Sequence, residues 1–211
     1  MKHNLQVSEI FNSIDGEGKR AGVLATFIRL TGCNLRCSYC DTAYAFQGGS
    51  EMSVEEIVYN HTIYRNVTLT GGEPLCQNIH PLLQVLHDHN VNIETNGSID
   101  IEPYFVHPNA WMTVDYKCNS SGETSAMLEH NFSILRPQDV LKFVVGTHED
   151  LQQAYDVCQR HALCCPIYVS PVFGRIAPVE IVTFMKEKNI EDWKLQLQLH
   201  KFIWNPNARG V

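Results

Sequence analysis

Strand-like apolar runs of four to eight residues alternate with longer amphipathic segments along this chain, and that alternation limits the folds it can adopt. Residues 23–30 form a nearly continuous apolar run, as expected for a strand that is buried on both faces. A capping box at Ser53 predicts the start of a helix. The further strands expected from the pattern are residues 67–70, 91–94, 111–115, 141–145, 166–169 and 193–199, and the expected helices are 53–64, 80–88, 149–161 and 178–188.

Repeated strand-then-helix units indicate a parallel sheet, because a right-handed crossover through a helix is the usual connection between parallel strands. Six or seven strands are too few for a closed eight-stranded barrel. We therefore expect an α/β fold over residues 1–211, a single domain built as a partial, open β/α barrel with about six parallel core strands.

Polar or glycine-containing segments follow most of the expected strands. The carboxyl ends of parallel strands meet at one edge of the sheet, so these segments are expected to come together there and to form the functional site. The segments are Thr31-Gly32, Gly71-Gly72-Glu73-Pro74, Thr95-Asn96-Gly97, Tyr116-Lys117 and Ser170-Pro171.

Composition narrows the class of protein further. Charged residues make up 18% of the chain and hydrophobic residues 44%, which excludes a disordered chain or a highly charged coiled coil. The formal net charge of −7 favours a small-molecule substrate over nucleic acid. No apolar run is long enough for a signal-peptide core or a membrane span, so we expect a cytoplasmic protein with reduced thiols and no membrane contact.

Three cysteines, Cys33, Cys37 and Cys40, lie within eight residues directly after the first expected strand. One loop with this spacing can wrap a single inorganic centre. A structural zinc site takes four protein ligands and a [4Fe-4S] cluster normally takes four cysteines, so three cysteines leave one position open. Two interpretations remain at this point: a cluster with an open iron, or a zinc site completed by a distant residue such as Cys76, Cys118 or a histidine.

A second motif, Thr70-Gly71-Gly72-Glu73-Pro74, follows about 30 residues later at the end of the next expected strand. Adjacent glycines let the backbone approach a ligand closely, although a glycine turn closed by proline is also common. Taken with the cysteine loop, this motif resembles the radical S-adenosylmethionine superfamily.

The superfamily resemblance implies a cofactor set. It implies that the three cysteines bind one [4Fe-4S] cluster whose open iron is chelated by S-adenosylmethionine, and that reductive cleavage of this cosubstrate yields a 5′-deoxyadenosyl radical. Gly72 matches the position that bonds the cosubstrate's amino group, and Tyr39 fills the aromatic position of the loop. The cofactor-binding residues implied by the two motifs are Tyr39, Gly71, Gly72 and Glu73.

Four flanking segments, residues 11–18, 40–42, 94–97 and 196–201, narrow the resemblance to the 7-carboxy-7-deazaguanine synthase family. That family of lyases converts 6-carboxy-5,6,7,8-tetrahydropterin to 7-carboxy-7-deazaguanine in queuosine and 7-deazapurine biosynthesis. Hydrogen is taken from the pterin carbon that bears the carboxylate, the ring contracts, hydrogen is returned and ammonia leaves. S-adenosylmethionine is thereby regenerated.

The family resemblance also implies a substrate site. Arg29 matches a substrate-binding arginine, and the alternative is an ion pair with Glu17 or Asp41. Asp15 stands where the family usually has glutamine, so a side-chain contact there is in doubt but a backbone contact is not. His200 is placed at the end of the last expected strand, where a purely structural histidine is the alternative. The implied substrate-binding residues are Ile14, Asp15, Gly16, Glu17, Arg29, Thr70, His200 and the C-terminal Val211.

Two looser matches concern the cosubstrate and a metal ion. Asp115-Tyr116-Lys117 and Ser170-Pro171-Val172-Phe173 fall where the family binds the adenosyl ribose and adenine, and ordinary strand-end turns are the alternative. Thr42 matches a position whose hydroxyl helps to bind Mg²⁺, and the alternative is a hydrogen bond to local backbone. The other cysteines show no second ligand spacing, so no auxiliary cluster is expected.

The implied partners are a small pterin substrate, an electron donor such as flavodoxin or ferredoxin, and a second copy of the chain in a homodimer. A radical S-adenosylmethionine activating enzyme, which places a glycyl radical on a large protein, is one alternative because such enzymes share the small size and the cysteine spacing. A zinc-stabilised module without catalysis is the alternative from another class.

Overall fold

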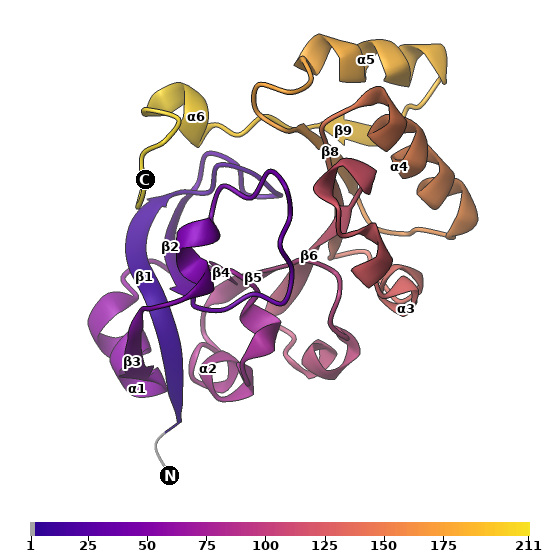
Figure 1. The fold of residues 1–211 in the computed structure, drawn as a ribbon. Coiled ribbons are helices and arrows are strands. Elements are labelled where there is room, and N and C mark those ends of the chain that lie inside the picture. The colour runs from indigo at the N-terminus through magenta and orange to yellow at the C-terminus, as the bar shows by residue number, and fades with distance from the viewer. Residues whose placement is uncertain (1–2) are drawn as a thin grey trace.

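The computed structural model describes residues 3–211, and a single sheet runs through them in the order β3-β1-β2-β4-β5-β6-β7-β8-β9 (Figure 1). The strands are β1 (Asn4–Ile14), β2 (Leu24–Leu30), β3 (Ser50–Ser53), β4 (Asn66–Gly71), β5 (Asn90–Thr95), β6 (Ala110–Lys117), β7 (Val140–Val145), β8 (Ile167–Pro171) and β9 (Trp193–Leu195). From β2 to β9 every neighbouring pair in this order is parallel. The open, mostly parallel sheet expected from the alternation of apolar runs is therefore confirmed.

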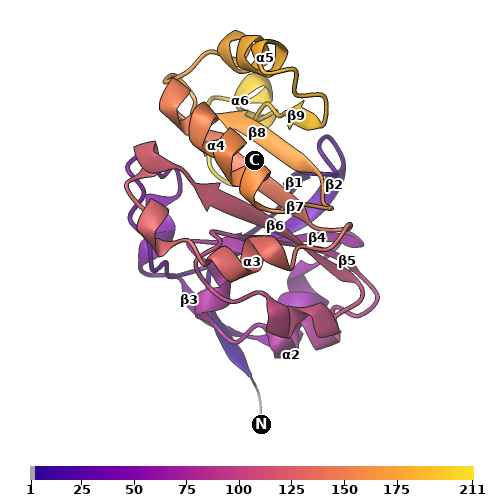
Figure 2. The same cartoon turned by 90° about the vertical axis from the view of Figure 1, so that its right-hand side faces the viewer.

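Helices α2 to α5 connect the parallel strands and lie against one face of the sheet, whereas α6 follows the last strand (Figures 1 and 2). The helices are α1 (Val54–Glu56), α2 (His80–Val85), α3 (Glu129–Ser133), α4 (His148–Arg160), α5 (Pro178–Glu187) and α6 (His200–Ile203). Single 3₁₀ turns span Ala43–Phe46, Pro74–Cys76, Glu102–Val106, Asn119–Ser121 and Thr124–Ala126. No helix within residues 3–211 has both the length and the apolar character that crossing a bilayer would require.

Two strands were not expected from the sequence. β1 runs antiparallel to β2, and β3 runs antiparallel to β1, so they extend the sheet at one end. The pairing of β1 with β2 shifts register between Val7 and Glu9. This bulge breaks the two-residue alternation of buried side chains, which is the pattern that identifies a strand from sequence alone.

Two expected elements end differently in the structure. The Ser53 hydroxyl accepts from the Glu56 backbone at 3.2 Å as the capping box predicts, but α1 passes into a π-helical turn, Ile57–His61, instead of continuing as an α-helix. The last expected strand, residues 193–199, was too long: β9 ends at Leu195 and His200 begins α6.

Aromatic side chains pack across three strands of the sheet, β6, β7 and β9. Phe143 on β7 is fully buried, with ring centroids 5.4 Å from Tyr116 on β6 and 6.3 Å from Trp193 on β9. Its ring therefore ties together strands that are 77 residues apart in sequence, from Tyr116 to Trp193.

Truncation of this ring tests the packing. We predict that Phe143→Ala lowers the free energy of unfolding by about 3–5 kcal/mol, because the surrounding strands cannot close over the cavity that is left. Phe202→Ala is the control, since Phe202 is 67% exposed, and should change stability by no more than about 0.5 kcal/mol. Denaturant unfolding followed by circular dichroism measures both. Equal losses in the two variants would show that Phe143 is not a core contact.

Candidate active site

The cysteine loop, residues 31–42, runs from the end of β2 toward the end of β6 (Figure 1). Its Ser38 N–H donates to the Ser121 carbonyl at 2.9 Å, and the Tyr39 hydroxyl donates to the Val144 carbonyl at 3.2 Å. These bonds hold the loop over the carboxyl ends of the parallel strands, the edge where the site was expected.

The three cysteines of this loop are close neighbours with free, partly exposed thiols. Burial raises the pKa of Cys37 and of Cys40. The neighbouring Cys33 raises the pKa of both further, and the charge of Lys117 opposes the rise. Bringing a metal to these thiols would therefore release protons.

Three thiols in one loop suit a four-iron cluster, in which each thiolate binds a different iron and one iron is left open. A structural zinc site would need a fourth protein ligand. Within residues 3–211, the close group of potential ligand atoms is the exposed set Asp100, Glu102 and His130, and it includes none of the cysteines.

The glycine pair after β4 packs directly against the cysteine loop. A side chain at Gly71 would collide with the Leu30 carbonyl, and one at Gly72 would collide with the Gly32 carbonyl and lie 2.8 Å from Cys33 Cβ. The Glu73 N–H donates to the Gly32 carbonyl at 2.7 Å. Glycine is required at both positions because backbone touches backbone there.

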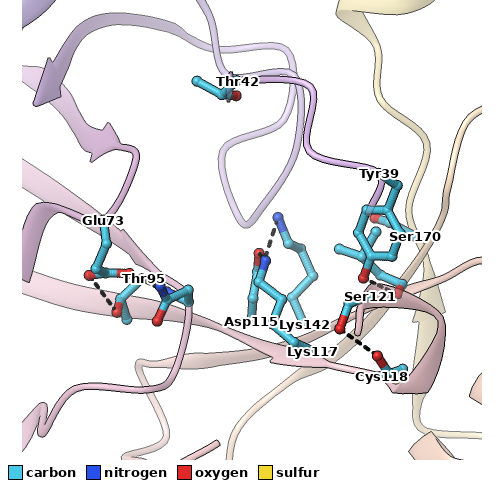
Figure 3. A network of polar contacts seen from close by, with 12 residues as sticks. Tyr39, Thr42, Glu73, Thr95, Asp115, Lys117, Cys118, Ser121, Lys142 and Ser170 are labelled. Carbon is cyan, nitrogen blue, oxygen red and sulfur yellow. Dashed lines mark hydrogen bonds and ion pairs between the residues drawn. The ribbon is translucent and has the colours of Figure 1, made fainter. Parts of the chain in front are cut away.

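The Glu73 carboxylate is fully buried and bonded to the neighbouring strand end (Figure 3). It accepts from Leu75 N–H at 3.0 Å, the Thr95 hydroxyl at 2.9 Å and Asn96 N–H at 2.6 Å. Burial raises the pKa of Glu73 to about 7, even though these three donors lower it. The carboxylate thus ties the glycine motif to the turn after β5.

Buried charges from two strands, β6 and β7, and from the loop after β1 meet beside the cysteine loop, and Figure 3 shows those on the two strands. Lys142 Nζ on β7 lies 3.1 Å from Asp115 Oδ1 and 3.4 Å from Glu17 Oε2, and Lys117 Nζ lies 2.6 Å from Asp115 Oδ2. Burial would lower the pKa of Lys142, but the carboxylates of Asp115 and Glu17 raise it well above its usual value.

Lys142 and Glu94 were missed by the sequence analysis, although a signal was present. Both are charged residues within runs expected to be buried strands, residues 141–145 and 91–94. Burial raises the pKa of Glu94, while the nearby Lys142 lowers it. A charge inside an apolar strand is costly unless it is paired, so it points to a polar interior.

Arg29 lies on β2, and its ion-pair partner differs from both alternatives considered above. Its Nε donates to Glu9 Oε1 on β1 at 2.7 Å, and the Tyr44 hydroxyl donates to the same oxygen at 2.7 Å. Glu17 and Asp41 were therefore the wrong partners. Within residues 3–211 the two terminal nitrogens of Arg29 have no hydrogen-bond partner, so its fork can still bind an anion.

The loop after β1 brings its residues to the site in different ways. The Asp15 side chain is paired with Arg20 at 2.8 Å and accepts from the Thr68 hydroxyl at 2.6 Å. Glu17 points to the interior charges, and the N–H groups of Gly16 and Glu17 find no acceptor within residues 3–211.

Thr70 and the C-terminal residues lie near the same edge. Thr70 on β4 is the register partner of Arg29, and His200 Nδ1 lies against Gly16. Burial lowers the pKa of His200, which keeps its imidazole neutral at pH 7. The tail returns to β1 (Figure 1), with the Arg209 guanidinium 4.1 Å above the Tyr44 ring, and this brings Val211 toward the Arg29 side of the sheet.

The two cosubstrate segments are only partly brought to the site. Asp115 and Lys117 belong to the interior charges, but the Tyr116 side chain points to the opposite face and packs 5.1 Å from Phe132. Only the Tyr116 backbone is left for a ligand.

The second segment borders the interior charges and a cavity. The Ser170 hydroxyl donates to Glu17 Oε1 at 2.9 Å, and Val172 is buried. Pro171 and Phe173 line a mostly apolar cavity of about 340 Å³ next to α6.

Thr42 follows the third cysteine and is partly exposed. Its hydroxyl donates to Asp41 Oδ1 at 2.9 Å, so the bond goes to a neighbouring carboxylate instead of the backbone. The Asp41 side chain is 59% exposed and lies 3.6 Å from Lys201 Nζ. These are hard oxygen donors of the kind that Mg²⁺ prefers.

Comparison with known proteins agrees with the motif analysis. Residues 27–105 match the model of the Radical SAM superfamily. A 7-carboxy-7-deazaguanine synthase of Clostridium acetobutylicum is 46% identical over 220 residues, which cover 99% of this chain and all of that protein. The enzyme of the same name from Methanospirillum hungatei is 40% identical, covering 96% of this chain and 86% of the relative. The enzyme of that name from Koribacter versatilis is 34% identical, and the match covers 98% of this chain and all of the relative.

A solved structure supports the fold. The crystal structure of QueE from Escherichia coli superposes with a TM-score of 0.75 at 24% identity and covers 92% of this chain and 94% of its own. With the identity of the sequence relatives over nearly their whole length, these matches confirm the resemblance drawn from the motifs: the chain belongs to the 7-carboxy-7-deazaguanine synthase family.

Proposed function

We propose that this protein is a radical S-adenosylmethionine lyase that converts 6-carboxy-5,6,7,8-tetrahydropterin to 7-carboxy-7-deazaguanine with release of ammonia, for queuosine or other 7-deazapurine biosynthesis. The observation that carries the proposal is the contact between the glycine pair and the cysteine loop at the edge of the sheet, with Gly72 against Cys33. The names of relatives that match nearly the whole chain supply the product, and the family resemblance of the motifs supplies the substrate.

Cys33, Cys37 and Cys40 would hold the [4Fe-4S] cluster, and the Gly71–Glu73 backbone would bind the methionine part of S-adenosylmethionine. The close backbone contact at Gly72 supports this, because a ligand on the cluster would lie against that segment. When bound, the cluster and S-adenosylmethionine supply the one-electron chemistry that removes hydrogen from the substrate. The protein's part is to hold and orient the two ligands.

Asp115 and Ser170 mark where the cosubstrate's ribose and adenine would lie. Asp115 is kept ionised because Lys117 and Lys142 lower its pKa by more than burial raises it. An ionised carboxylate accepts hydrogen bonds from a ribose diol. The backbone at Lys117 and Val172 would complete this half of the site, and Tyr39 and Phe173 would border it.

The substrate would lie between Arg29 and the loop after β1. The unpaired terminal nitrogens of Arg29 suit a carboxylate, and the free N–H groups of Gly16 and Glu17 suit the pterin's carbonyl and ring nitrogens. Thr70 would add a hydroxyl, neutral His200 a ring nitrogen, and Ile14 and Val211 would bound the pocket.

Mg²⁺ would bind at Thr42, beside the substrate carboxylate. The adjacent Asp41 carboxylate supports this, since Mg²⁺ commonly takes one or two protein oxygens and keeps several waters.

We infer a single domain that works as a homodimer in the cytoplasm, with flavodoxin or ferredoxin as electron donor. Free thiols throughout residues 3–211 suit a reducing compartment. The activating-enzyme and zinc-module alternatives are not favoured, since the relatives match the chain over nearly its whole length and residues 27–105 match the Radical SAM superfamily.

The reaction is tested by anaerobic turnover. We expect wild-type protein to form several equivalents of 7-carboxy-7-deazaguanine per S-adenosylmethionine, because hydrogen returned to the deoxyadenosine regenerates the cosubstrate. Mass spectrometry of product and cosubstrate measures the ratio. One deoxyadenosine released per product would contradict a catalytic cosubstrate, and no product at all would overturn the proposed function.

The cluster ligands are tested by single substitutions. Cys33→Ala, Cys37→Ala and Cys40→Ala should each lose bound iron, the brown colour and S-adenosylmethionine cleavage. Cys76→Ala is a matched control, because its exposed thiol lies 3.8 Å from Asn34 Oδ1 beside the same loop. Iron analysis and visible absorbance of reconstituted protein measure the effect. Loss of iron in Cys76→Ala, or its retention in Cys37→Ala, would refute the ligand set.

The metal site is tested with Thr42→Val, which removes a hydroxyl and keeps the volume. We expect the variant to retain its cluster and to lose most of the stimulation of turnover by Mg²⁺. Thr62→Val is the control, since the Thr62 hydroxyl bonds the Ile57 carbonyl, far along the chain from the site. Turnover against Mg²⁺ concentration is the measurement, and unchanged stimulation in Thr42→Val would place the ion elsewhere.

A further inference from the structure

We propose that Asp15 and Arg20 form a positioning pair that fixes the substrate loop, residues 14–18, so that affinity for the pterin depends on an ion pair that the pterin does not touch. The proposal deepens the proposed function and rests on it. It also explains why this chain has aspartate where its family usually has glutamine.

The Arg20 guanidinium uses all of its nitrogens. Nε lies 2.8 Å from Asp15 Oδ2, Nη1 donates to the Asn90 carbonyl at 2.8 Å, and Nη2 donates to the Val67 carbonyl at 3.0 Å and the Thr68 hydroxyl at 2.8 Å. Its flat face stacks 4.8 Å from the Trp111 ring centroid. One side chain therefore joins the substrate loop to β4, β5 and β6.

These contacts lie at the amino ends of the strands, opposite the cysteine loop. Asn90 is the first residue of β5, Val67 the second of β4 and Trp111 the second of β6. The loop after β1 is thus anchored at the edge of the sheet away from the chemistry. From that anchor the loop runs toward the carboxyl ends of the strands as far as Glu17. The Glu17 carboxylate lies 3.4 Å from Lys142 Nζ and accepts from the Ser170 hydroxyl at 2.9 Å.

Asp15 is held by backbone as well as side chain. Its N–H donates to the Val23 carbonyl at 2.9 Å, and its own carbonyl accepts from Gly22 at 2.8 Å. Both carboxylate oxygens are engaged, one by Arg20 and the other by Thr68. With both oxygens engaged and the side chain only 4% exposed, Asp15 is not accessible to substrate, and it holds the adjacent Gly16 and Glu17 N–H groups in a fixed place.

Charge explains the choice of aspartate. The Arg20 and Asp15 side chains are 13% and 4% exposed, so each charge is largely removed from water. A buried cation needs a counter-charge, and glutamine would supply a hydrogen-bond acceptor without one. Burial raises the pKa of Asp15, and Arg20 opposes that rise, so each member of the pair depends on the other.

The chain contains a matched control pair. Arg136 Nε lies 2.8 Å from Asp139 Oδ2, Asp139 is fully buried, and the guanidinium stacks 4.0 Å from the Phe105 ring. Asp139 Oδ1 accepts from Met112 N–H at 2.9 Å near the amino end of β6. This pair has the same chemistry at the same edge of the sheet, but it does not touch the substrate loop.

The experiment compares Arg20→Met with Arg136→Met in reconstituted, full-length protein. Each variant is assayed for the KM and kcat with 6-carboxytetrahydropterin, for S-adenosylmethionine cleavage without pterin, and for melting temperature. Arg20→Met should raise the pterin KM roughly 10- to 100-fold, since a displaced loop weakens every contact that it makes. Its pterin-independent cleavage should stay within about twofold of wild type.

Arg136→Met should lower the melting temperature by about as much as Arg20→Met does, while its pterin KM stays within about twofold of wild type. Asp15→Asn, which keeps the shape and removes the charge, gives a milder second variant and should also raise KM. A wild-type KM in both Arg20→Met and Asp15→Asn, or equal rises in Arg20→Met and Arg136→Met, would overturn the positioning role. Absence of product from wild type would overturn the proposed function together with this role, so the two failures are distinguishable.

Discussion

The rest of the site depends on a backbone contact between the end of β4 and the cysteine loop. Gly71 and Gly72 carry no Cβ, and this lets their peptide groups lie against Leu30, Gly32 and Cys33. Parallel pairing of β2 with β4 brings the two segments to the same edge, and the buried Glu73 carboxylate fixes the second segment to the turn after β5. The cysteine loop and the glycine motif are thereby joined without any side chain between them.

The interior of the sheet is charged where a stability-optimised core would be apolar. Lys117 pairs with Asp115 at 2.6 Å, and Lys142 lies between two carboxylates, 3.1 Å from Asp115 and 3.4 Å from Glu17. Pairing offsets much of the cost of removing these groups from water, although apolar residues of equal volume would often be more stable. The charges are better explained by ligands: Glu17 belongs to the loop expected to hold substrate and Asp115 to the segment expected to hold cosubstrate, so one lysine orients groups on both sides.

The parallel sheet and the chemistry at its edge could be predicted because both are local in sequence. Apolar runs identify buried strands, and the cysteine spacing and the glycine pair identify ligands. What could not be predicted depends on register and on distant pairing. Glu9 became the partner of Arg29 only because β1, hidden by its bulge, pairs across β2. The end of β9 at Leu195 was equally unpredictable, since alternating residues continue beyond it.

The two edges of the sheet differ in how fully their polar groups are bonded. At the amino ends, arginine–aspartate pairs are buried with both carboxylate oxygens of Asp15 and of Asp139 bonded, which rigidifies the structure. At the carboxyl ends, Arg29 and the loop after β1 keep donors without protein partners, which leaves them able to bind a ligand but adds little stability. Open donors hold their positions only if something else fixes them. The loop after β1 is both fixed and open to a ligand because it spans the two edges of the sheet. Asp15 and Arg20 anchor it at the amino ends, and the free N–H groups of Gly16 and Glu17 lie toward the carboxyl ends.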